Sequence, residues 1–180
     1  MTIIIDENVQ LELIARKHAN ELYDAVDKNR EHLSEFLPWV SKMQSLADFQ
    51  QYIENCEALY EQKKEISFAI LLDDTAVGRI GLHHLNLENK NGSIGYWLTK
   101  NAEGKGIVTN SCKKLINYGF EQLGLHRLEI KAAVKNVKSQ SIPRKLNLTK
   151  EGILREAELV NGVYMDLVLY SILRHECKQC

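Results

Sequence analysis

The stretch GYWLTKNAEGKGIVTNSCKKLI, residues 95–116, decides how the rest of the chain is interpreted. Its apolar start predicts a strand that ends at Leu98, a short polar loop follows, and Gly104-Lys105-Gly106 opens a predicted helix. The first N–H groups of a helix have no partner within it, and the helix dipole favours an anion there. Glycines carry no Cβ, so a bulky pyrophosphate can approach the backbone. The loop therefore predicts a phosphate cradle, although the same glycines also suit a plain strand-to-helix turn.

Two better-known phosphate loops fit this stretch poorly. A P-loop NTPase requires G-x-x-x-x-G-K-[ST], but Lys105 is followed by Gly106 and Ile107, so the hydroxyl that holds magnesium is missing. A dinucleotide-binding fingerprint requires G-x-G-x-x-G after the first strand of a βαβ unit. Here position 109 is threonine, and the loop follows a predicted antiparallel meander.

Hydrophobic periodicity predicts seven strands and four helices around this loop. Ser45 followed by Asp48 is typical of a helix N-cap. The last strand is apolar on both faces, which indicates a central or doubly covered position. The pattern predicts an α+β or mixed α/β fold, one sheet with helices on both faces. The expected strands are 9–13, 66–72, 76–85, 93–98, 127–134, 149–156 and 163–173, and the expected helices are 16–32, 49–60, 104–122 and 136–145.

The length, charge and start of the chain limit its class. With 180 residues and no linker-like segment, we expect a single domain over residues 1–180. The net charge is −1 and no dense Lys/Arg run occurs, which argues against direct nucleic-acid binding. The start lacks a basic signal-peptide region, and no apolar run approaches the ~20 residues that cross a membrane. We therefore expect a cytoplasmic protein without a membrane partner.

The sequence offers no convincing metal or disulfide site. The four cysteines are expected to be reduced, as is usual in a cytoplasm. Cys177 and Cys180 form a lone C-x-x-C, whereas a structural zinc site needs four ligands. We interpret this pair as free thiols of a frayed tail. His83 and His84 have no third ligand nearby and are expected to be surface or substrate-loop residues.

Residues 95–173 resemble the GNAT acetyltransferases. That family places [QR]-x-x-G-x-[GA] at the start of a helix to bind a pyrophosphate, and this chain has Asn101-Ala102-Glu103-Gly104-Lys105-Gly106. Asn101 departs from the pattern, which affects a side-chain contact but leaves the backbone cradle.

The downstream half is similar to the RimL-like branch, the bacterial ribosomal-protein N-terminal acetyltransferases. The segment HLSEFLPWV, residues 32–40, also matches that branch in style. Asn147 stands where relatives have glycine in L-G-F, and asparagine can still adopt the left-handed turn required there. The matching positions are Asn136 and Ser139, Thr149 with Glu151-Gly152, Ala157-Glu158, Asn161-Gly162, Tyr164 and Asp166.

The resemblance implies a GNAT-like domain with a mostly antiparallel sheet of about seven strands and a splayed strand pair. It implies that acetyl-CoA is the co-substrate and lies in the gap between the two splayed strands, and that no metal is required. Carried over by motif, Glu158 is the general base, acting through water, and Ser139 is the acid for the departing sulfur. The implied cofactor-binding residues are Leu98, Glu103, Gly104, Lys105, Gly106, Ile107, Val108, Asn136 and Ser139.

Each of these assignments has a plainer alternative in the sequence. Glu158 could be a solvated carboxylate, and Ser139 could cap the short helix that follows Asn136. Trp39 could form a wall of the acceptor site or belong to the core. Tyr164 and Asp166 are expected to have structural or substrate-lining roles.

The acceptor amine is suggested by proton chemistry. A peptide α-amine has a pKa of ~7.7–8.0, against ~10.4 for a lysine side chain, so it needs less help to lose its proton. The leading hypothesis is therefore acetylation of a protein N-terminus, with a ribosomal protein as the candidate substrate. The alternatives are a small amine such as a polyamine, aminoglycoside or amino-acid derivative, and a non-catalytic acyl-CoA sensor. The apolar last strand and family habit indicate a homo-oligomer.

Overall fold

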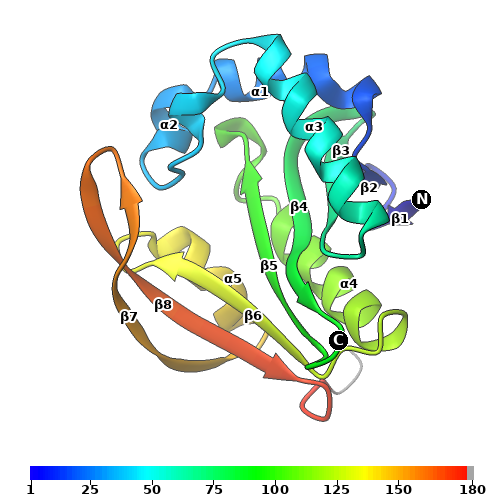
Figure 1. The fold of residues 1–180 in the computed structure, drawn as a ribbon, viewed down its shortest axis with the longest axis vertical. Helices are drawn as coiled ribbons and strands as arrows, with labels where there is room; N and C mark the ends of the chain where they lie inside the picture. Colours follow the sequence, from blue (N-terminus) through cyan, green and yellow to red (C-terminus); the bar gives the residue numbers. More distant parts are fainter. Residues whose placement is uncertain (178–180) are drawn as a thin grey trace.

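One sheet of eight strands runs through the computed structural model, which describes residues 1–177 (Figure 1). The strand order is β1-β2-β3-β4-β5-β6-β8-β7, and every neighbouring pair is antiparallel except β5–β6. The predicted α+β sheet is confirmed, with β1 as an eighth strand that three residues were too short to reveal. The strands are β1 (Thr2–Ile4), β2 (Val9–Leu13), β3 (Ile66–Leu72), β4 (Thr75–Asn86), β5 (Asn91–Leu98), β6 (Arg127–Ala133), β7 (Thr149–Val160) and β8 (Val163–Leu173).

Helices cover both faces of the sheet, as expected (Figure 1). Successive side chains of β3 point to opposite faces of the sheet, and both faces are apolar. Phe68 and Ile70 pack into the core beneath α4, whereas Ala69 and Leu71 pack toward α1 and α3. The helices are α1 (Ala19–Asp27), α2 (Arg30–Ser34), α3 (Leu46–Glu61), α4 (Ile107–Glu121) and α5 (Val137–Lys145), with single 3₁₀ turns at η1 (Arg16–His18), η2 (Val40–Lys42) and η3 (Lys100–Ala102).

The N-terminal helices differ from the prediction at one point. The expected helix 16–32 is broken at Asn29, whose φ of −125° is not helical. Asn29 Nδ2 donates to Ala25 O (2.8 Å) at the end of α1, and its Oδ1 accepts from Lys100 N (3.1 Å) in the loop after β5. The break therefore supports the loop in front of α4. The predicted cap at Ser45 is confirmed, since its hydroxyl accepts from Asp48 N.

The central strands β5 and β6 separate along their length, as the resemblance implied. They pair in parallel only over Asn91–Ser93 with Arg127–Glu129. From Ile94 to Leu98, β5 pairs with β4 alone. A gap therefore opens in the middle of the sheet toward the C-terminal ends of both strands.

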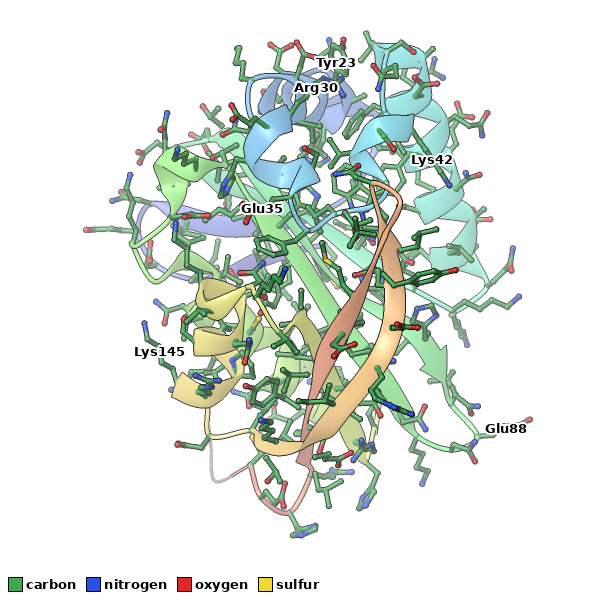
Figure 2. All side chains as sticks on the ribbon, turned by 90° about the vertical axis from the view of Figure 1, so that its left-hand side faces the viewer. Tyr23, Arg30, Glu35, Lys42, Glu88 and Lys145 are labelled. Carbon is green, nitrogen blue, oxygen red and sulfur yellow. The ribbon has the colours of Figure 1, made fainter. Side chains whose placement is uncertain are left out.

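The β7–β8 hairpin reaches from the sheet to the α2 region (Figures 1 and 2). Its turn is formed by Asn161 and Gly162, which have φ of 50° and 79°. Asn161 Nδ2 donates to Ser34 O at the end of α2 (2.9 Å). The predicted central position of β8 is confirmed, because it lies between β6 and β7.

Candidate active site

A cleft of about 750 Å³ lies beside the gap between β5 and β6. Its walls come from α2 and the segment after it, the end of β5, the loop before α4, and α5. Figure 2 labels Glu35 on the α2 side and Lys145 on the α5 side of this cleft. Of the predicted site residues, eight line it: Leu98, Glu103, Gly104, Gly106, Ile107, Val108, Asn136 and Ser139.

The N-terminus of α4 lies at one end of the cleft. Gly104 and Gly106 have φ of 79° and 77°, and a Cβ at Gly104 would meet no other atom within 4 Å. The helical hydrogen bonds begin at Asn110, whose N–H donates to Gly106 O (2.9 Å). The N–H groups of Ile107 and Val108 have no acceptor within the helix, and they are available to a phosphate. This geometry is compatible with the phosphate cradle that the sequence predicts.

The backbone of Leu98 faces the gap. Thr99 N donates to Val77 O (2.8 Å), and Leu98 is opposite Gly78. Hydrogen-bonded and non-hydrogen-bonded pairs alternate along an antiparallel ladder, so the N–H of Leu98 points away from β4. It is thus free to polarise a carbonyl that lies between β5 and β6.

Ser139 does not cap α5, which removes one alternative left open by the sequence. The cap is Asn136, whose Oδ1 accepts from Ser139 N (2.9 Å). The Ser139 hydroxyl instead lies 3.2 Å from the hydroxyl of Tyr96 on β5. The Ser139 side chain is therefore available to the cleft. The only side-chain oxygen of Asn136 already accepts the Ser139 N–H.

Glu103 joins three walls of the cleft through ion pairs. Its carboxylate is 2.8 Å from His32 Nε2 on α2 and 2.6 Å from Lys138 Nζ on α5. Partial burial acts to raise the pKa of Glu103, but Lys138 and His32 outweigh it and lower that pKa. A carboxylate beside an anion cradle is tolerable because Lys138 compensates its charge. The sequence contains no signal for this arrangement.

Two predicted site residues do not line the cleft. Lys105 is exposed within the loop, and Glu158 lies on β7 opposite Met165 of β8. Glu158 is half-buried, and burial raises the pKa of its carboxyl. Within residues 1–177 this carboxyl has no hydrogen bond or ion pair. Such a group accepts a proton more readily than an ordinary surface carboxylate.

The structure also places the remaining residues singled out in the sequence. Trp39 is partly buried and packs against the core residue Trp97, with ring centroids 5.9 Å apart. Asp166 Oδ1 accepts from Glu156 N (2.8 Å) across the β7 bulge, which is a structural role. Tyr164 is exposed. Asn147 has φ of 58°, so the expected left-handed turn is confirmed.

No cluster of three or more potential metal ligands occurs among the described residues. Of the two positions expected for His83, the surface position is wrong, because the side chain is largely buried with Nδ1 2.9 Å from Glu65 Oε2. The Cys177–Cys180 pair extends beyond the described residues. In the same part of the chain, no helix has the length and apolar character needed to span a bilayer.

Comparison with known proteins identifies the family. Residues 8–149 match the family model described as the acetyltransferase (GNAT) domain. The ribosomal-protein-serine acetyltransferase of Escherichia coli (strain K12) is 30% identical over 170 residues, covering 94% of this chain and 95% of that protein. The chain therefore belongs to the GNAT acetyltransferase family, and the predicted membership and enzyme class are confirmed.

Two solved structures share the whole fold. RimL, a ribosomal L7/L12 alpha-N-protein acetyltransferase in complex with coenzyme A, has a TM-score of 0.93 and 25% identity, covering 96% of this chain and 98% of its own. The microcin C7 self-immunity acetyltransferase MccE, in complex with acetyl-CoA and AMP, has a TM-score of 0.90 and 31% identity, covering 94% of each chain. RimL is named for a ribosomal protein and MccE for immunity to microcin C7, so membership of the family alone does not define the substrate.

Proposed function

We propose that this protein transfers the acetyl group of acetyl-CoA to the α-amine at the N-terminus of a protein, with a ribosomal protein as the leading candidate. The observation that supports acetyl-CoA as the donor is the gap between β5 and β6, which ends at the glycine loop before α4. A pyrophosphate bound at the helix N-terminus would direct the pantetheine arm along the Asn136 side of the gap toward Leu98.

The residues around the gap have the properties that acetyl transfer requires. The amine nitrogen attacks the thioester carbonyl carbon, and the Leu98 N–H stabilises the negative charge that develops on its oxygen. The C–S bond then breaks with its electron pair on sulfur. Ser139 gives its hydroxyl proton to that sulfur and regains one from water. Glu158 removes one proton from the amine through a water molecule and later releases it to solvent, so the proton balance closes.

The half-buried position of Glu158 supports its assignment as the base. Because burial raises the pKa of this carboxyl, its conjugate acid is closer to the α-amine in acidity than an exposed glutamic acid would be. Its absence from the lining of the donor cleft suits an acceptor that enters from the opposite side of the gap. An α-amine with a pKa of ~7.7–8.0 needs only this moderate base.

The test is a thiol-release assay with acetyl-CoA, run on peptides that start with Ser or Ala and on spermidine at equal concentration. The proposal predicts that kcat/KM for the peptides exceeds that for spermidine. It also predicts that Glu158→Gln lowers kcat by about 10²–10⁴-fold, as expected for loss of a general base. Glu156→Gln, an exposed carboxylate on the same strand, is the matched control.

A preference for spermidine would instead favour the small-amine alternative. Binding of acetyl-CoA without turnover on any amine would favour a sensor.

We further propose that the enzyme is a cytoplasmic homo-oligomer. Support for the assembly comes from four exposed apolar side chains on the β7–β8 hairpin, which are Ile153, Leu159, Val163 and Tyr164. Sedimentation velocity tests it, since Val163→Glu should shift the protein toward monomer, and a wild-type monomer at micromolar concentration contradicts it. The buried thiols of Cys56 and Cys112, neither of which forms a disulfide, suit a reducing compartment.

A further inference from the structure

One side chain connects the two walls of the gap at the position of Ser139. Tyr96 on β5 places its hydroxyl 3.1 Å from Ser139 O and 3.2 Å from Ser139 Oγ on α5. The two residues are 43 positions apart in the sequence, and both line the cleft. The Tyr96 hydroxyl therefore fixes α5 relative to the strand along which the thioester would lie.

The sequence of α5 explains why its backbone accepts this bond. Pro143 lies inside the helix and has no N–H, so the usual helical hydrogen bond to the carbonyl of Ser139, four residues earlier, cannot form. The Tyr96 hydroxyl donates to that carbonyl instead. Its oxygen keeps lone pairs that can accept from the Ser139 hydroxyl.

Ser139 is thus held at three atoms. Its N–H donates to Asn136 Oδ1, its carbonyl accepts from Tyr96, and its Oγ lies against the same phenol oxygen. A serine hydroxyl without such a contact is free to occupy three staggered positions about χ1. The contact with Tyr96 selects one of them and sets its distance from β5.

We infer that Tyr96 is a positioning residue for acetyl transfer, which holds the Ser139 hydroxyl in place beside the departing sulfur. The inference rests on the proposed function, because it gives Ser139 the role of acid. Tyr96 keeps its own proton and adds no proton transfer to the reaction. Burial raises the pKa of Tyr96, so its hydroxyl stays protonated and able to donate at every working pH.

The competing account is that Tyr96 only fills space, since its ring packs against the main core. Tyr96→Phe separates the two accounts because it keeps the ring and removes the hydroxyl. Tyr118→Phe on α4 is the matched control, since Tyr118 packs against the same core but lies outside the cleft.

The first experiment is a kinetic double-mutant cycle with acetyl-CoA and an accepted amine. We expect Tyr96→Phe to lower kcat by about 10–100-fold and to leave the KM for acetyl-CoA within about twofold, with Tyr118→Phe near wild type. Combined with Ser139→Ala, Tyr96→Phe should add no further loss, because its effect passes through Ser139. Losses that multiply in the double variant, or a Tyr96→Phe kcat within twofold of wild type, would overturn the inference.

The second experiment does not depend on turnover. Hydrogen–deuterium exchange at the first turn of α5, residues 137–140, should be at least about threefold faster in Tyr96→Phe than in wild type or Tyr118→Phe. Unchanged exchange there would refute the positioning role. If the wild-type protein acetylates no amine, the proposed function fails, and this measurement alone decides whether Tyr96 positions Ser139.

Discussion

The phosphate cradle gives a prediction in which backbone strain and ligand binding can be separated. Gly104 has φ of 79° and open space around its missing Cβ, and it faces the cleft. Gly124 has φ of 65° and equally open space, but it lies beyond the far end of α4. Alanine in a left-handed conformation costs about 1–2 kcal/mol at either position. For a chain of this size, that lowers Tm by about 2–8 °C.

The two variants should differ in their affinity for acetyl-CoA. The Cβ of Gly104→Ala occupies space that a pyrophosphate needs, and loss of one hydrogen bond to a charged group costs about 1.5–3 kcal/mol. We therefore expect Kd for acetyl-CoA, measured by isothermal titration calorimetry, to rise about 10–100-fold in Gly104→Ala. Gly124→Ala should bind like wild type. Wild-type affinity in Gly104→Ala would refute the cradle, and equal losses in both variants would show that the effect is global.

Three further perturbations follow from other contacts. Glu103→Gln removes a negative charge beside the cradle and frees Lys138, so CoA should bind about twofold more tightly by calorimetry, and weaker binding would contradict this. Gly78→Ala places a Cβ 2.4 Å from Trp97 O, which costs about 3 kcal/mol and should lower Tm by about 6–12 °C. An unchanged melting curve would count against the β4–β5 packing. Burial alone would raise the pKa of Glu65, but His83 and Arg79 outweigh this effect, and the pKa of Glu65 is lowered to about 2. Its stabilisation is therefore present above pH 4.5 and lost as the pH falls toward 2, so urea midpoints of wild type and Glu65→Gln should converge in that range rather than stay parallel.

Local patterns in the sequence were sufficient for the features that depend on neighbouring residues. Gly104 and Gly106 predict a strand-to-helix loop by themselves, and Ser45 with Asp48 predicts the helix cap that the structure contains. The motif resemblance added the splayed strands, which no periodicity contains. The three-residue strand β1 was missed because it is stabilised only by pairing with β2.

Contacts between distant segments were not predictable. Asn29 and Lys100 are 71 positions apart, and Tyr96 and Ser139 are 43 apart. Neither pair produces a periodic signal. The same holds for Glu103, a cofactor-binding residue by resemblance, whose contacts with His32 and Lys138 appear only in the fold. The position of Asn136 as the cap of α5, which leaves the Ser139 hydroxyl available, also required the structure.

The central claim is that the acetyl group is transferred to an α-amine, and one measurement addresses it most directly. A peptide that begins with Ser and carries a single internal Lys is incubated with acetyl-CoA and the enzyme, and the modified atom is located by tandem mass spectrometry. The account predicts acetylation of the N-terminal nitrogen, with the lysine side chain unmodified and the product strongly reduced in Glu158→Gln. Acetylation of the lysine, or product formation at the wild-type rate in Glu158→Gln, would contradict it.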